Sequence, residues 1–314
     1  MFPFHYVLLL ITAIFISSTF SRAPPKFADW FARHKFFPIS LLSGGGTAMN
    51  HTMGYCFDNA ELLKHLKLPC DIVSNNPNIT AASTIVVSHT DEAIIITFMS
   101  TSNQQELVEE MATIYETSPF PGGGTVSKFF YNAIMVLWNG GIKDTYLKTK
   151  NKNPNYEVWV TGGSMGGALS SLMAGYLVQM GYASSSAVKL MTFGEPRNGH
   201  KDLADPVKLM TFGEPRNGHK DLADRFPSLV PWAYRVVHRF DDIPHIVPTN
   251  MGYQHHKNEI WYDNDMDVND PFIECDEPES LKCSNSLSPD KWSRADHSTY
   301  FKNGHPCKKT PGPK

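Results

Sequence analysis

A serine stands between glycines in the segment Gly-Gly-Ser-Met-Gly-Gly, residues 162–167, and this Gly-x-Ser-x-Gly spacing is typical of nucleophilic chemistry. The segment follows an apolar run at residues 157–161 and precedes a helical pattern at residues 168–180. On such a sharp turn, the hydroxyl of Ser164 would be held away from the sheet, and the helix N-terminus would favour negative charge nearby. A glycine-rich turn without chemistry is the alternative, and the flanking strand and helix argue against it.

A serine nucleophile needs a base and an acid that orients the base, and here the expected chain order is serine, acid, histidine. Asp241 is the candidate acid because it directly follows the apolar run at residues 232–240, and Asp242 is its neighbouring alternative. His297 is the candidate base because it lies late in the chain. With Ser164, these groups could cleave an ester through an acyl-enzyme, the histidine taking the serine proton and the aspartate fixing the imidazole tautomer.

Strand-like and helix-like segments alternate along most of the chain. Short runs rich in β-branched residues occupy residues 84–87, 93–98, 157–161, 189–193 and 232–240, and helical spacing occupies residues 126–147 and 168–180. This alternation predicts an α/β fold with a mostly parallel central sheet and helices on both of its faces. From residue 263 onward the sequence is polar, and we expect irregular structure there.

One stretch, VKLMTFGEPRNGHKDLAD, occurs twice without a difference, at residues 188–205 and 207–224. Two perfect copies are not a solenoid, which needs at least three repeats. Each copy carries one apolar run, and the link between the runs barely allows a crossover between parallel strands. We therefore expect one copy in the sheet and the other as an insertion. The whole mature chain, residues 22–314, is then a single domain with a duplicated 19-residue segment near residues 188–224.

The N-terminus indicates a secreted protein. Residues 7–16 are an apolar run too short to cross a bilayer, and small residues follow it, so residues 1–21 are expected to be a cleaved signal peptide. An uncleaved anchor or a buried helix is the weaker alternative. No later segment is long and apolar enough to span a membrane. The net charge of −3, with no basic cluster, gives no indication of a nucleic-acid partner.

Cysteines and sequons fit the same compartment. Cys275 and Cys283 close a short loop that an oxidising compartment would bridge, and the odd total of five cysteines leaves one thiol over. Sequons at Asn50 and Asn78 could carry N-linked glycans.

Acidic residues between positions 263 and 274 have part of the spacing of an EF-hand calcium loop. Val268 stands where that loop needs glycine for its sharp turn, and Pro271 interrupts it. A solvated acidic loop is the better interpretation. We expect neither a metal nor a cofactor in this protein.

Four motifs in order resemble the fungal-type class 3 triacylglycerol lipase family, a branch of the α/β-hydrolases. The serine turn resembles V-T-G-H-S-L-G-G-A; residues 192–197 resemble T-F-G-x-P-R; residues 235–245 resemble R-V-V-x and D-x-V-P-H; residues 296–301 resemble D-H-x-x-Y-F. The resemblance covers roughly residues 56–307. It implies the α/β-hydrolase fold, with Ser164 as nucleophile, Asp241 rather than Asp242 as acid, and His297 as base.

The resemblance also implies an oxyanion hole made by the backbone N–H groups of Met165 and Thr101. The family's F-R-G-T is Phe98-Met99-Ser100-Thr101 here, and the lost glycine could alter the backbone that presents Thr101. Gly163 replaces a histidine of the family, which affects local packing more than chemistry.

The same resemblance pairs Cys56 with Cys307 and Cys275 with Cys283, which leaves Cys70 as the odd thiol.

Apolar residues at helical spacing follow Thr101, namely Leu107, Met111, Ile114 and Tyr115. In similar lipases this region, residues 102–117, is a mobile lid whose apolar face meets lipid. A surface helix packed permanently on the core fits the same spacing.

These observations predict a secreted serine hydrolase that cleaves the carboxylic ester bonds of lipids at a lipid–water interface, with triacylglycerol as the first candidate substrate. A phospholipase or a short-chain esterase is the alternative among enzymes. A catalytically silent relative that binds lipid or a partner is the alternative from another class. Met99-Ser100 and the duplication favour the silent relative weakly, and the complete set of serine, aspartate and histidine opposes it.

Overall fold

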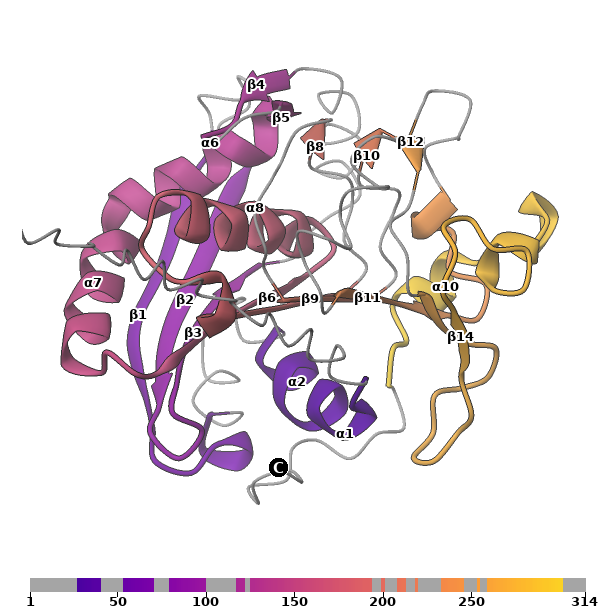
Figure 1. Cartoon of the computed structure of the whole chain (residues 1–314), viewed down its shortest axis with the longest axis horizontal. Helices are drawn as coiled ribbons and strands as arrows, with labels where there is room; N and C mark the ends of the chain where they lie inside the picture. The colour runs from indigo at the N-terminus through magenta and orange to yellow at the C-terminus, as the bar shows by residue number, and fades with distance from the viewer. Residues whose placement is uncertain are drawn as a thin grey trace, which may run out of the picture.

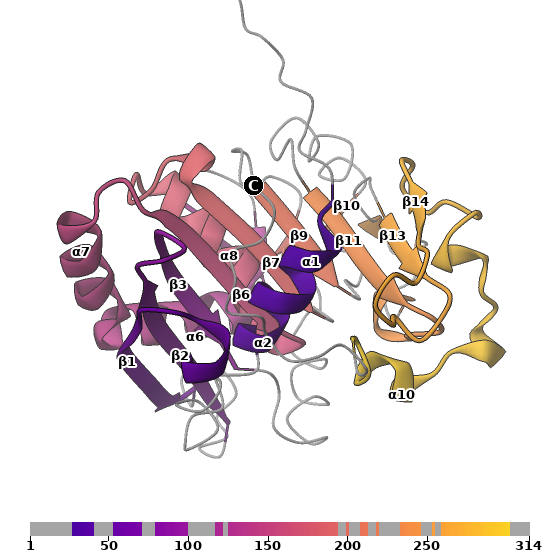
Figure 2. The same ribbon diagram turned by 90° about the horizontal axis from the view of Figure 1, so that it is seen from below.

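A nine-stranded sheet forms the centre of the computed structural model, which describes residues 27–40, 53–70, 79–99, 117–121, 125–193, 199–200, 208–212, 218–219, 233–245, 253–254 and 259–301. The strand order is β1-β2-β3-β6-β7-β9-β11-β13-β14, as Figure 2 shows for the sheet that Figure 1 views from its edge. Adjacent strands from β3 to β13 are parallel, whereas the pairs β1–β2, β2–β3 and β13–β14 are antiparallel. The predicted α/β fold with a mostly parallel sheet is confirmed.

The strands of this sheet are β1 (Ala60–Pro69), β2 (Thr80–Ser88), β3 (Ala93–Phe98), β6 (Glu157–Gly163), β7 (Val188–Phe193), β9 (Lys208–Phe212), β11 (Ala233–His238), β13 (Glu259–Tyr262) and β14 (Ile273–Cys275). Two small sheets are formed by β4 (Thr117–Pro119), β5 (Thr125–Ser127) and β8 (Gly199–His200), and by β10 (Gly218–His219) and β12 (Tyr253–Gln254).

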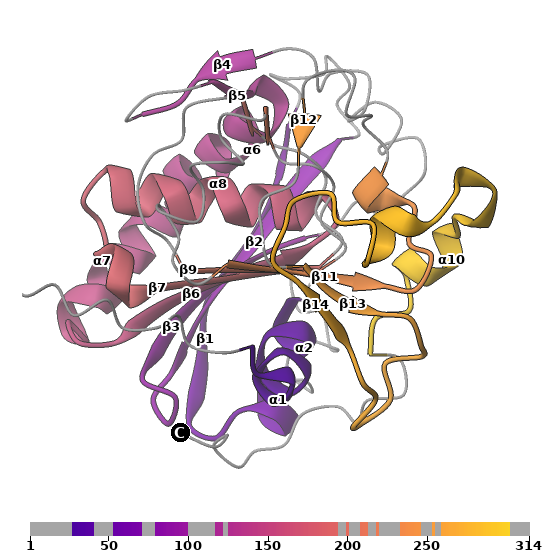
Figure 3. The same cartoon turned by 45° about the vertical axis from the view of Figure 1, so that its right-hand side comes forward.

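Helices cover both faces of the sheet (Figures 2 and 3). On one face lie α6 (Lys128–Leu137) and α8 (Met165–Gln179), with α7 (Lys143–Lys152) toward the β1 edge; on the other lie α1 (Asp29–Phe31) and α2 (Phe37–Ser40), joined by a π-helical turn. A last short helix, α10 (Arg294–His297), lies beyond the end of β11. Every residue of β3 is buried, as expected for a strand covered on both faces.

The helical pattern predicted over residues 126–147 is two helices rather than one. Gly141 has φ +130°, a backbone conformation outside the helical region, and it separates α6 from α7. A side chain at this position would also meet the end of Lys64 from β1.

Both copies of the duplicated segment contribute a strand to the sheet, so the expectation of a single strand was wrong. The first copy forms β7 and the second forms β9, and the two pair in parallel with identical residues opposite each other, such as Leu190 opposite Leu209. A crossover between parallel strands needs about a dozen residues, which the link at residues 194–207 supplies. An identical strand therefore fits beside its copy in register. As a result, β6 and β11 are separated by two strands.

A buried ion pair links the N-terminal helices to the turn between β2 and β3. Lys35 is 1% exposed, its Nζ lies 2.9 Å from Oδ1 of Asp91, and the ammonium also lies 4.8 Å from the ring centre of Phe57. Asp91 accepts a further hydrogen bond of 2.7 Å from the hydroxyl of Ser88. Since the pair is desolvated, each charge depends on the other.

We expect Asp91→Ala to lower the free energy of unfolding by about 3–5 kcal/mol, because it removes the counter-ion of a buried ammonium. Equilibrium unfolding in denaturant, followed by tryptophan fluorescence, measures the change. Asp276→Ala removes an exposed carboxylate and is the control, with an expected change of about 0.5 kcal/mol or less. A loss for Asp91→Ala no larger than that of the control would contradict the prediction.

The cysteines follow the predicted pairing as far as the described residues show it. Cys275 and Cys283 form a disulfide, and Cys56 is also disulfide-bonded, while its expected partner Cys307 lies outside the described residues. Cys70 keeps its thiol, which is buried and donates to the carbonyl of Leu68 at 4.0 Å.

Several other predictions also lie outside the described residues. These concern the signal peptide at residues 1–21, the sequons at Asn50 and Asn78, and residues 102–116 of the predicted lid. Within the described ranges, no helix combines the length and apolar character that a bilayer span requires.

Candidate active site

Ser164 lies on a strained turn between β6 and α8. Its backbone has φ +48° and ψ −125°, which a residue other than glycine rarely adopts and which costs about 1–3 kcal/mol. The turn is fixed by α8, since the carbonyl of Ser164 accepts from the N–H of Gly167 at 2.8 Å. The local geometry therefore matches the sharp strand-to-helix turn predicted at residues 162–167, a shape known as a nucleophile elbow.

Two glycines allow the elbow to pack against β3. A Cβ atom added to Gly162 would collide with the backbone of Gly166 and lie 2.9 Å from the carbonyl oxygen of Phe98. A Cβ atom added to Gly166 would collide with that same oxygen and lie 2.8 Å from the carbonyl group of Met99. The Gly-x-Ser-x-Gly spacing is thus required by close backbone contact on both sides of the serine.

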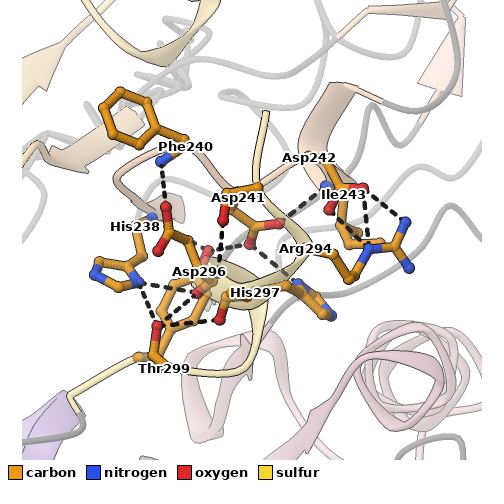
Figure 4. A network of polar contacts seen from close by, with 12 residues as sticks. His238, Phe240, Asp241, Asp242, Ile243, Arg294, Asp296, His297 and Thr299 are labelled. Atoms are coloured by element: carbon orange, nitrogen blue, oxygen red, sulfur yellow. Dashed lines mark hydrogen bonds and ion pairs between the residues drawn. The ribbon is translucent and has the colours of Figure 1, made fainter. Parts of the chain in front are cut away.

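Asp241 is fully buried just beyond the end of β11, and its carboxylate accepts three hydrogen bonds. Oδ1 accepts from the backbone N–H of Ile243 at 2.9 Å. Oδ2 accepts from the hydroxyl of Tyr300 at 2.7 Å. Oδ2 also lies 3.0 Å from Nδ1 of His297 (Figure 4). A carboxylate with this many donors is held in one orientation.

The bond to Asp241 determines which nitrogen of His297 can act as a base. An ionised carboxylate only accepts hydrogen bonds, so Nδ1 of His297 carries the hydrogen that it donates to Asp241. In the neutral ring, Nε2 is then left as the acceptor. The side chain of His297 is 13% exposed, whereas that of Asp241 is fully buried.

Tyr300 is also a site residue. It belongs to the D-H-x-x-Y-F motif, but the sequence alone predicted no role for it. Its hydroxyl accepts from the backbone N–H of His238 at 3.2 Å and donates to Asp241. Burial, followed by the negative charge of Asp241, raises the pKa of Tyr300 well above its ordinary value of 10. The phenol therefore stays protonated and keeps donating to the carboxylate.

Asp242, the alternative acid, makes a different contact. Its carboxylate accepts hydrogen bonds from the guanidinium of Arg294. Nη2 lies 2.7 Å from Oδ2, and Nε lies 2.9 Å from both oxygens. Of the two neighbouring carboxylates, only Asp241 contacts His297 within the part of the chain that the structure describes.

The serine lies at the same edge of the sheet as the acid and base, because β6 and β11 are parallel and Ser164 and Asp241 each follow the end of their strand. Two strands, β7 and β9, separate them. Among the described residues, no hydrogen bond joins Ser164 to His297.

Met165 is the first of the two predicted oxyanion donors. It is the first residue of α8, so its N–H has no partner within the helix. Thr101, the second predicted donor, lies outside the described residues. The described range that contains β3 ends two residues earlier, at Met99, which lies beside Gly166.

The acidic loop at residues 263–274 does not assemble a metal site. Across the described residues, no three histidine, cysteine, aspartate or glutamate side chains come close enough together to hold a metal ion. One of its carboxylates, Asp265, instead pairs with Arg239.

Comparisons with known proteins agree with this architecture. The family model described as Lipase (class 3) matches residues 95–208 and 200–251. The two matches overlap at residues 200–208, within the duplicated segment.

Similar proteins are lipases. A lipase of Caenorhabditis elegans is 30% identical over 333 aligned residues, covering 95% of this chain and 86% of the relative. A secreted mono- and diacylglycerol lipase of Penicillium camembertii is 28% identical over 57% of this chain and 51% of the relative. The solved triacylglyceride lipase of Rhizomucor miehei has a TM-score of 0.62 at 25% identity, covering 84% of this chain and 91% of that one.

The fold is therefore that of the α/β-hydrolases. The chain belongs to the class 3 lipase family and is a carboxylic ester hydrolase similar to triacylglycerol lipases.

Proposed function

We propose that the protein is a secreted lipase that hydrolyses acylglycerols, with Ser164 as nucleophile, His297 as general base and Asp241 as the acid that orients it. The observation that carries the proposal is the buried Asp241 carboxylate, which fixes His297 through Nδ1 at the same sheet edge as the strained Ser164. Elbow, acid and base follow one another in the order expected of an α/β-hydrolase.

The reaction follows from these contacts. Nε2 of His297 accepts the proton of the Ser164 hydroxyl as its oxygen attacks the ester carbonyl, and the imidazolium then gives that proton to the departing alcohol. Water, activated by the same nitrogen, attacks the acyl-enzyme and releases the fatty acid. Asp241 stabilises the imidazolium throughout, and Tyr300 and Ile243 hold its carboxylate in place.

Negative charge on the tetrahedral oxygen would be stabilised by the N–H groups of Met165 and Thr101. The N-terminus of α8 adds its positive dipole end at the same point. Removing one such donor typically lowers kcat by about 100- to 1,000-fold. The position of Gly166 against the carbonyl groups of Phe98 and Met99 supports Thr101, because the chain leaves β3 directly beside the elbow.

Acylglycerols are favoured as substrates because the similar proteins are named mono- and diacylglycerol or triacylglyceride lipases. A substrate panel with purified protein tests this: emulsified triolein, phosphatidylcholine vesicles and p-nitrophenyl butyrate. We expect fatty acid release from triolein to exceed release from phosphatidylcholine. Faster release from phosphatidylcholine would favour a phospholipase, and activity on the soluble ester alone would favour an esterase.

Secretion is supported by the N-terminal apolar run and by the disulfide between Cys275 and Cys283. Expression in a eukaryotic secretory host should release protein into the medium with a mature N-terminus close to Arg22. Retention in the cell with residues 1–21 still attached would contradict the proposal.

The duplicated strand affects the distance between nucleophile and base. Strands lie about 4.8 Å apart, so β6 and β11 are about 14 Å apart with two strands between them and about 10 Å apart with one. An imidazole with a hydrogen bond on each side bridges only about 8 Å between serine and carboxylate oxygens. One intervening strand suits that bridge better than two.

We therefore expect the variant that lacks residues 188–206 to hydrolyse esters at least as fast as the full chain, with kcat/KM higher by up to about tenfold, because the position of the general base affects the rate. The remaining copy can keep both neighbours in register, because Leu190 lies opposite Val160 of β6 and its duplicate Leu209 lies opposite Ala233 of β11. Circular dichroism and steady-state kinetics of both chains provide the measurement. An unfolded deletion variant beside a soluble, active full chain would show that both strands are structural.

A further inference from the structure

The base His297 is held by a very short element. It is the last residue of α10, which has only four residues, and helices of that length are not stable by themselves. The position of the imidazole therefore depends on contacts between α10 and the loop that carries Asp241. Figure 4 shows these contacts in one network.

One of these contacts is the ion pair between Arg294 and Asp242. Its three N–O distances lie between 2.7 and 2.9 Å, a fork-like arrangement that fixes direction as well as distance. The side chain of Arg294 is 49% exposed and that of Asp242 is 19% exposed, and ion pairs this exposed contribute little to stability. The geometry of the pair matters more than its energy.

Other contacts hold the same helix from the opposite side. The N–H of Ser293 donates to the carbonyl of Phe240 at 2.7 Å, and the N–H of Phe240 donates to Oδ2 of Asp296 at 3.3 Å. Nδ1 of His238 lies 2.9 Å from the carbonyl oxygen of Asp296. These contacts fix the backbone of α10. The side chain of Arg294, the first residue of α10, adds the contact with Asp242.

The positions of the two charged residues couple them to the catalytic pair. Arg294 precedes His297 by three residues, so both side chains lie on one face of the helical turn. Asp242 directly follows Asp241 in the chain. The ion pair therefore closes a ring in which Asp241 and Asp242 face His297 and Arg294, respectively.

We propose that Asp242 and Arg294 are positioning residues that hold the imidazole of His297 in line for proton transfer. The proposal rests on the proposed role of His297 as the base. Neither residue touches the reacting atoms. A displacement of about 1 Å in a catalytic group can reduce the rate about 100-fold.

The experiment measures kcat and KM for p-nitrophenyl butyrate in Asp242→Ala, Arg294→Ala and Arg294→Lys. We expect kcat to fall about 10- to 100-fold in all three variants, with KM within about twofold and thermal unfolding little changed. Arg294→Lys keeps the charge but loses the fork, so its loss identifies geometry as the cause. If only charge mattered, removing the anion and removing the cation would change kcat in opposite directions, and Arg294→Lys would retain activity.

Two further variants complete the test. The exchange of both residues, Asp242→Arg with Arg294→Asp, restores the pair and should recover most of the lost kcat. The matched control is Asp265→Ala, which breaks the ion pair that Asp265, on the connection between β13 and β14, makes with Arg239 on the loop that carries Asp241. Its kcat should stay within twofold of the unmodified protein.

The outcomes separate this proposal from the proposed function. If Asp242→Ala and Arg294→Ala stay within twofold of the unmodified protein while activity still depends on Ser164, the positioning role is wrong. If hydrolysis by the unmodified protein does not depend on Ser164, the proposed function itself fails.

Discussion

Ser164→Ala is expected to lower kcat for ester hydrolysis about a million-fold, the size of loss seen when a serine hydrolase loses its nucleophile. Alanine keeps the strained backbone of the elbow, since the φ of +48° is imposed by β6, α8 and the two flanking glycines. The fold should therefore persist, with unchanged circular dichroism and thermal unfolding. Kinetics with a soluble p-nitrophenyl ester measure the loss without an interface.

Ser171→Ala is the matched control for this variant. Ser171 lies on α8, two turns beyond Ser164. The kcat of Ser171→Ala should stay within about twofold of that of the unmodified protein. Turnover in folded Ser164→Ala protein within tenfold of the unmodified chain would show that another group is the nucleophile.

Asp241→Asn is expected to lower kcat about 10,000-fold. An amide in place of the carboxylate can donate to Nδ1 of His297 and so favour the tautomer that has no acceptor at Nε2. The change preserves volume. With the amide oxygen in the place of Oδ1 it still accepts from the N–H of Ile243, while the amide NH2 takes the place of Oδ2 and faces His297 and Tyr300.

Asp242→Asn provides the comparison, because it alters the adjacent residue, whose carboxylate pairs with Arg294. We expect its loss to be at least 100-fold smaller than that of Asp241→Asn. Equal losses, or a larger loss for Asp242→Asn, would mean that the acid has been assigned to the wrong member of the pair.

The central strands were predictable because burial on both faces leaves continuous apolar runs. β3 and β6 have this pattern, and the sequence placed both within two residues of their observed ends. β1 was missed because it is the edge strand, and its half-exposed residues include lysines that interrupt any apolar run. β13 was missed because its four residues are too few to show a period.

Short-range chemistry in the site was predictable, and long-range pairing was not. The elbow is a local motif, so Ser164 and its glycines could be recognised from spacing alone. The pairing of Asp242 with Arg294 joins residues 52 positions apart, and nothing in the local sequence of either indicates it. Tyr300 likewise reaches Asp241 across 59 positions.

The duplicated strand was misjudged for a physical reason. The expectation of one strand rested on the number of positions that the sheet needs. A parallel sheet, however, can accept an added strand wherever a crossover reaches and the register is satisfied. Identical copies satisfy the register automatically, as Leu190 opposite Leu209 shows.

Labelling with a fluorophosphonate probe tests the assignment of Ser164 most directly, because the probe reacts only with a serine activated by a nearby base. The unmodified protein should be labelled once, on the peptide that contains Ser164, as identified by mass spectrometry. Ser164→Ala should not be labelled, and Asp241→Asn should react far more slowly. Labelling of another residue, or none in the folded full chain and the deletion variant, would contradict a serine hydrolase built on Ser164, Asp241 and His297.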